Sequence, residues 1–149
     1  MEENARANEE PSVVECEIFI AAAPETIFPF LVEPRLLEHW IGISRAREPR
    51  PLRPFSIEFD SGHVARGVYT TVSPPRRVAF TWGWDGEDAV PPGTSLVEIE
   101  LVPQEGGTLV RLRHSGLPEN APPLFSPASH KEHWSRYLAR LKAAVASHC

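Results

Sequence analysis

One long amphipathic segment at the end of the chain limits the possible folds more than any other feature. Large apolar side chains recur in it at helical spacing, namely Trp134, Leu138, Leu141 and Val145. Ser126 stands before this segment as a favourable N-terminal helix cap. A helix of about 20 residues is about 30 Å long, which is enough to lie across a whole small sheet. The sequence therefore predicts a terminal helix whose apolar face is covered by another layer of structure.

The part of the chain before this helix is patterned as strands. Between Ile43 and Leu117, short runs of β-branched and aromatic residues alternate with turn signals, as in a meandering antiparallel sheet. The runs predicted to form strands are residues 43–48, 54–60, 63–73, 77–84, 94–103 and 107–116. An earlier strand is predicted from the alternation that starts at Val14 and ends at Ile20. In the last hairpin we expect one inner face, formed by Val97, Ile99, Leu101, Val110, Leu112 and His114.

Two short helices are expected after the first strand. Pro24 suits the first turn of a helix, and Glu25 suits its positively polarised end. Pro29 inside the apolar run and Pro34 just after it predict that this helix is short and is broken before a second helical turn at residues 36–40. The expected fold class is therefore α+β, with a curved antiparallel sheet of six or seven strands wrapped around the long C-terminal helix.

The domain organisation follows from length and composition. Residues 1–11 are acidic, lack periodicity and are predicted to be a disordered tail, while residues 12–149 are predicted to form one domain. The net charge of −5 argues against a nucleic-acid partner, and no apolar run is long enough for a membrane span. We expect a cytoplasmic protein in which Cys16 and Cys149 are free thiols.

Several separate segments of the chain resemble one known family. They are residues 23–25, 37–40, 74–82, 106–118, 133–134, 137–138 and 141. In this order they are similar to the START-like (SRPBCC) superfamily, and within it to bacterial proteins related to the activator of heat-shock-protein-90 ATPase. The resemblance implies a helix-grip fold with a central cavity. His133 stands where relatives often have glycine, so its imidazole is expected to crowd or line the entrance.

Aromatic residues supply most of the candidate site. Trp82 and Trp84 share one side of a predicted strand, and Trp40 and Trp134 come from helices expected to cover that sheet, so these rings either wall a pocket or fill the core. The residues predicted to line a ligand site are Trp40, Arg66, Trp82, Trp84, His114, Trp134 and Tyr137. His114 is expected on the inner face, either as a buried hydrogen-bonded histidine or as a group that orients a ligand or moves a proton.

Three functions remain open at this point. The first is noncatalytic binding of a small apolar or aromatic molecule within the helix-grip cavity. The second is an enzyme similar to polyketide cyclases and aromatases, with His114 as the base and Tyr137 or Arg66 assisting it. The third is a chaperone-associated domain with a protein partner, which would use the acidic tail and the arginine-proline loop at residues 45–54. No cofactor or metal is predicted, because only His130 and His133 have a spacing that a metal uses.

Overall fold

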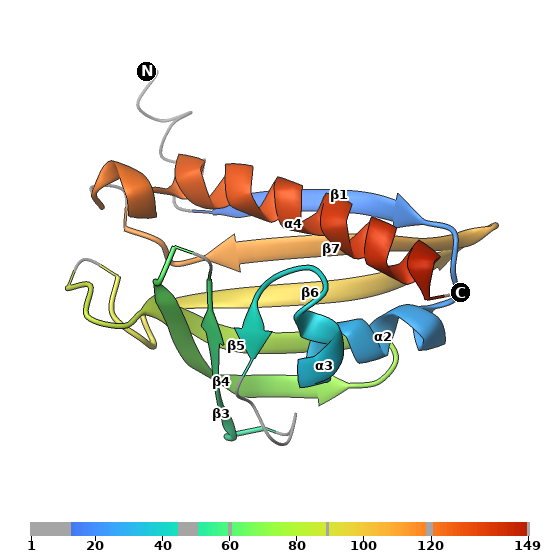
Figure 1. The fold of residues 1–149 in the computed structure, drawn as a ribbon, viewed down its shortest axis with the longest axis horizontal. Coiled ribbons are helices and arrows are strands. Elements are labelled where there is room, and N and C mark those ends of the chain that lie inside the picture. The colour runs from blue at the N-terminus through green and yellow to red at the C-terminus, as the bar shows by residue number, and fades with distance from the viewer. Residues whose placement is uncertain (1–12, 45–50, 60, 89, 119–120, 149) are drawn as a thin grey trace, which may run out of the picture.

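The computed structural model describes residues 13–44, 51–59, 61–88, 90–118 and 121–148. The predicted tail, residues 1–11, lies outside the described residues. Figure 1 shows the elements, which are β1 (Val14–Ile20), α2 (Pro24–Val32), α3 (Pro34–Leu37), β2 (Ile43–Ser44), β3 (Pro54–Glu58), β4 (Val64–Ser73), β5 (Arg77–Trp84), β6 (Ser95–Gln104), β7 (Gly107–Ser115), η1 (Pro123–Phe125) and α4 (Pro127–Ser147).

The strands form one antiparallel sheet of seven strands in the order β1-β7-β6-β5-β4-β3-β2. Each strand from β2 to β7 pairs with its sequence neighbour, and β1 closes the other edge against β7. Val97 lies opposite His114, and Leu101 lies opposite Val110, so the predicted inner face of the last hairpin is confirmed. The run predicted at residues 43–48 is described only as the short strand β2, and residues 45–48 lie outside the described residues.

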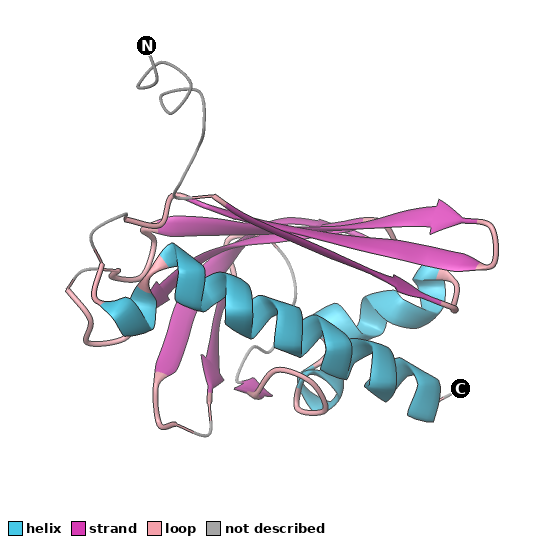
Figure 2. Ribbon diagram, turned by 90° about the horizontal axis from the view of Figure 1, so that it is seen from above, coloured by secondary structure: helices cyan, strands magenta, loops and turns pink. Residues whose placement is uncertain are grey.

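The helix α4 crosses the concave side of the sheet, as Figure 2 shows. Its buried residues repeat at helical spacing and include Trp134, Leu138, Leu141 and Val145, as predicted. The two short helices α2 and α3 are also confirmed, but α2 continues through Pro29 to Val32, and α3 spans Pro34–Leu37 instead of residues 36–40. The break falls at Glu33, immediately before Pro34. The α+β helix-grip architecture is therefore the one predicted from the sequence.

We expect replacement of Ser126 by Ala to lower the free energy of unfolding by about 1 kcal/mol. The Ser126 hydroxyl caps α4 by accepting the backbone N–H of Ser129 at 3.1 Å, and alanine leaves that donor without a partner. Thermal denaturation should show a fall in Tm of about 2–4 °C. Ser126→Asp keeps a side-chain acceptor, so an equal loss in both variants would contradict the capping role.

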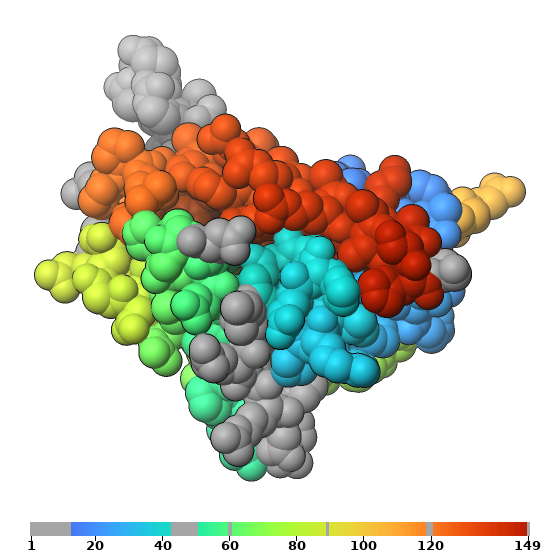
Figure 3. All heavy atoms as spheres, in the orientation of Figure 1, coloured from blue at the N-terminus to red at the C-terminus, as the bar shows by residue number. Residues whose placement is uncertain are grey.

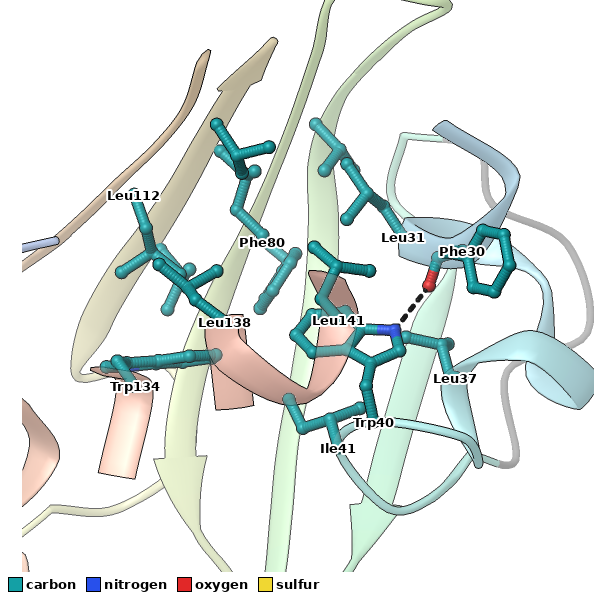
Figure 4. Close-up of a cluster of buried hydrophobic side chains, with 14 of the residues drawn as sticks. Phe30, Leu31, Leu37, Trp40, Ile41, Phe80, Leu112, Trp134, Leu138 and Leu141 are labelled. Atoms are coloured by element: carbon teal, nitrogen blue, oxygen red, sulfur yellow. Dashed lines mark hydrogen bonds between the residues drawn. The ribbon is translucent and has the colours of Figure 1, made fainter. Parts of the chain in front are cut away.

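The interior between α4, α3 and the sheet is filled rather than hollow. Figure 4 shows apolar side chains from these elements in mutual contact. The indole of Trp40 is buried there and donates to the carbonyl oxygen of Phe30 at 2.8 Å. The space left between Trp40, Phe55, Phe80 and Trp134 is about 10 Å³, which is about the room that one water molecule needs. Large aromatic rings thus occupy the position of the central cavity that the family resemblance implies.

Candidate functional site

A pocket of about 70 Å³ lies at the N-terminal half of α4, where this helix meets η1, the end of β5 and the turn before β4. We call it the aromatic pocket. Its aromatic and histidine walls are Phe59, Trp82, Trp84, Phe125, Trp134, Tyr137, His63, His130 and His133. Ser61, Leu124 and Ser129 complete the described lining. Leu124 is 54% exposed, so an apolar side chain stands at the mouth.

The rings of this pocket pack against one another at close range. The Trp82 ring lies 5.5 Å from that of Trp84 in a T-shaped arrangement and 5.2 Å from that of Trp134. Next to these tryptophans, Phe59 and Tyr137 are stacked with centroids 5.7 Å apart. Each ring is thus in contact with others, so the walls of the pocket are largely formed by packing within the protein.

His114 lies behind this wall and is completely buried. Its Nδ1 accepts a hydrogen bond from Nε1–H of Trp134 at 3.0 Å, because an indole nitrogen can only donate. In the neutral ring the proton is then on Nε2, which donates to the hydroxyl of Ser95 at 2.8 Å. That hydroxyl donates in turn to the carbonyl oxygen of Trp82 at 2.7 Å. Both ring nitrogens of His114 are therefore engaged within the protein.

The second buried histidine, His130, is held in the same way. Nε1–H of Trp84 donates to its Nε2 at 3.0 Å, so the proton is on Nδ1, which donates to the carbonyl oxygen of Ser126 at 2.9 Å.

Burial, and secondarily the neighbouring His130, lower the pKa of His114 well below its ordinary value. Burial also lowers the pKa of His130, although the hydrogen bond to Ser126 opposes this shift.

Trp82 differs from the other three tryptophans in its hydrogen bonding. The indole N–H groups of Trp40, Trp84 and Trp134 each donate to an acceptor at 2.8–3.0 Å. Nε1 of Trp82 is buried and has no acceptor, and it is the one such buried side-chain nitrogen or oxygen in the described part of the chain. A buried donor without a partner costs about 1–3 kcal/mol, so an acceptor supplied from outside would remove this cost.

His133 carries a ring nitrogen that is available to the pocket. Its Nδ1 donates to the carbonyl oxygen of Ser129 at 2.7 Å, which leaves Nε2 as an acceptor in the neutral ring. The side chain is half-buried and lines the aromatic pocket, as expected from its position before Trp134. The pocket therefore combines aromatic walls with the His133 ring, and the tryptophan whose N–H has no partner, Trp82, belongs to one of these walls.

The structure brings together four of the seven residues predicted to line a ligand site. Trp82, Trp84, Trp134 and Tyr137 line the aromatic pocket. The other three do not: Trp40 packs in the core, His114 lies behind Trp134, and Arg66 is exposed with its guanidinium 3.3 Å from Asp85. The structure places these three side chains outside the aromatic pocket, because packing against α3, a hydrogen-bond chain and an ion pair hold them elsewhere.

Sequence reasoning missed several pocket residues, chiefly Phe59, His63, Phe125 and His130. Phe59 and His63 lie at the two ends of the turn between β3 and β4, and Phe125 belongs to the proline-rich connection before α4. Neither segment has a periodicity that indicates where its side chains point. For His130 a signal existed, since it lies four residues before Trp134 and therefore on the same face of the predicted helix.

The described residues contain neither a metal-ligand cluster nor a helix suited to a membrane. In residues 13–44, 51–59, 61–88, 90–118 and 121–148, no group of three or more His, Cys, Asp and Glu side chains is arranged to hold a metal ion. Within the same described ranges, no helix is both long enough and apolar enough to cross a membrane.

The fold is similar to several solved structures. Protein MLL2253 from Mesorhizobium loti aligns with a TM-score of 0.81 at 24% identity, over 91% of this chain and 97% of that chain. The Aha1 dimer from Colwellia psychrerythraea aligns with a TM-score of 0.73 at 21% identity, over 89% and 95%. CalU16 from Micromonospora echinospora aligns with a TM-score of 0.72 at 20% identity, over 89% and 75%. At these identities the likeness concerns the fold.

The match to a protein family covers most of the chain. No curated protein matches it. The family described as Activator of Hsp90 ATPase homolog 1-like protein matches residues 21–146. This range contains every element from α2 to β7 and nearly all of α4, so it includes all the described residues of the aromatic pocket. The protein therefore belongs to the Activator of Hsp90 ATPase homolog 1-like family, within the START-like superfamily that the sequence resemblance indicated.

Proposed function

We propose that the protein binds a small aromatic or apolar molecule in the aromatic pocket without transforming it, and that the ligand carries a hydrogen-bond acceptor. The observation that supports this most strongly is the unpartnered indole N–H of Trp82 in the pocket wall. This nitrogen is covered in the structure, so a carbonyl or ether oxygen on the ligand would accept from it after a small shift of the Trp82 ring. The surrounding rings supply flat apolar faces for the rest of the molecule.

The size of the pocket limits what it holds. At about 70 Å³ it is well below the 300 Å³ or more that is typical of sites enclosing a whole drug-sized ligand. One ring or a short apolar group is therefore the part that enters. The remainder of the ligand would extend past Leu124 or along α4.

The enzymatic alternative has less support, because His114 is not exposed to the pocket and both its ring nitrogens are occupied. A general base must reach the proton that it removes. His133 reaches the pocket, but among the described lining residues no carboxylate is present to orient it. A protein-partner role also fits the family, although most of the surface predicted for it lies outside the described residues.

Matched probes test the proposal directly. Acetophenone and ethylbenzene share a phenyl ring with a two-carbon substituent, but only the ketone has an oxygen acceptor. We expect the protein to bind acetophenone about tenfold more tightly than ethylbenzene, as measured by isothermal titration calorimetry. Trp82→Phe retains an aromatic ring and removes the N–H, so it should bring the two affinities within about twofold of each other.

Trp40→Phe is the matched control, because it removes an indole N–H that donates to Phe30 outside the aromatic pocket. This variant should keep the preference for acetophenone. If Trp82→Phe also kept that preference, the assigned hydrogen bond would be wrong. If the wild-type protein bound neither probe, the proposed binding function itself would fail.

A further inference from the structure

The aromatic pocket continues into a second, wider groove along α4. This groove, which we call the arginine groove, has a volume of about 270 Å³ and contains Arg136 and Arg140. The residues that line both sites are Phe59, Ser61, His133 and Tyr137. Figure 3 shows the face on which α4 passes the α3 region and the turn before β4, the segments that line the arginine groove. The two sites are therefore neighbours with a common wall.

The arginine groove has an excess of positive charge in its described lining. Glu38 is its one described carboxylate, against the guanidinium groups of Arg136 and Arg140. Arg136 is 3.9 Å from Glu132, and both side chains are exposed, so water weakens this pair. Arg140 makes no ion pair with any described residue, and its guanidinium lies 5.6 Å from the centre of the Tyr137 ring. Arg140, which has no carboxylate partner among the described residues, thus stands beside a ring that also lines the aromatic pocket.

We infer that the ligand is amphipathic, with a ring in the aromatic pocket and a carboxylate or similar anion beside Arg140. This inference rests on the proposed function and specifies the class of molecule that it concerns. Alone, neither site reaches the usual size of a ligand pocket, but the two together reach the lower end of that range. A single molecule that extends past the residues common to the two linings would occupy both the aromatic pocket and the arginine groove.

The geometry of α4 sets the length of this ligand. His133, at the junction, and Arg140 are seven residues apart, which corresponds to about 10 Å along the helix axis. The Arg140 side chain shortens this span, because its guanidinium reaches back over Tyr137. A ring joined to a carboxylate by a chain of three or four carbons therefore matches the distance, and 4-phenylbutanoate is a suitable probe.

The test compares 4-phenylbutanoate with its uncharged methyl ester by calorimetry at low ionic strength. We expect Arg140→Gln to weaken binding of the carboxylate about fivefold and to leave binding of the ester unchanged. Arg111→Gln, on the outer face of the sheet, makes the same change in net charge and should alter neither affinity. Acetophenone should compete with 4-phenylbutanoate, because both rings need the aromatic pocket.

The possible failures are distinguishable. If Arg140→Gln left both affinities unchanged while the ester still competed with acetophenone, the anionic class would be wrong and the aromatic pocket would keep its function. If Arg111→Gln weakened the carboxylate as much as Arg140→Gln did, the effect would be one of overall charge, which would also overturn the inference. Binding of neither probe to the wild-type protein would remove the proposed function together with this inference.

Discussion

Lowering the pH from 7.5 to 5 should reduce the free energy of unfolding by about 2 kcal/mol or more, through the buried histidines His114 and His130. Their folded-state pKa values are lowered, mainly by burial, from the ordinary histidine value of 6.5. Above that value neither the folded nor the unfolded chain binds the proton. Below it the unfolded chain does, so each histidine that stays neutral in the fold costs up to about 1.4 kcal/mol per pH unit. Urea denaturation at pH 7.5, 6 and 5 measures this loss.

The hydrogen bonds explain why the fold resists protonation at these sites. Each of the two histidines accepts an indole N–H, from Trp134 or from Trp84. A proton added to the accepting nitrogen would point at a donor and would break the contact. The two rings also lie 5.1 Å apart, so a charge on one disfavours a charge on the other. Protonation therefore requires these contacts to open.

His114→Gln separates titration from packing. Glutamine offers an oxygen toward Trp134 and an N–H toward Ser95, and it does not titrate. We expect this variant to lose some stability at pH 7.5 and to show a smaller further loss at pH 5 than the wild-type protein does. An identical acid loss in His114→Gln and wild type would show that His114 is not responsible.

The fold was predictable because each of its elements is specified by residues that are close together in the sequence. Alternation along β1 and β7, helical spacing along α4, and prolines at the ends of α2 and α3 each specify an element over a few residues. The main difference concerns the interior. The sequence resemblance implied a cavity, whereas Trp40, Phe80 and Trp134 fill that space. Packing of large rings from separate elements depends on their distances in three dimensions, which periodicity does not contain.

The candidate site was predictable only where its residues lie on regular elements. Trp82 and Trp84 are predicted for the site from strand spacing and Trp134 from helix spacing, and Tyr137 is predicted as a further lining residue on the same helix. His114 was correctly expected to point inward. The indole of Trp134 separates His114 from the pocket. This contact joins residues that are 20 positions apart in the sequence. The turn and loop residues of the pocket had no such pattern.

Replacement of Gly67 by Ala should have the largest effect on stability, a loss of about 3 kcal/mol or more in the free energy of unfolding. Gly67 lies in β4, where a Cβ atom would be 1.8 Å from the carbonyl oxygen of Thr81 in β5. Backbone atoms of two paired strands cannot move aside as the end of a flexible side chain does. Urea denaturation at pH 7.5 measures the loss, and it should appear as a lower midpoint with little change in slope.

The same substitution should also weaken the ligand site, because the strand that must move carries its wall. Thr81 precedes Trp82, and its hydroxyl accepts the backbone N–H of Val68 at 2.9 Å, so β4 and β5 are tied at this point. Gly86→Ala is the control: Gly86 has a φ of +78° and no atom within 4 Å of a new Cβ, so only backbone strain of about 1 kcal/mol is expected. Equal losses in the two variants would mean that the contact with Thr81 is relieved without cost. Acetophenone should bind more weakly to Gly67→Ala but not to Gly86→Ala, at a pH where both variants are folded. That result would connect the close approach of β4 and β5 to the shape of the aromatic pocket.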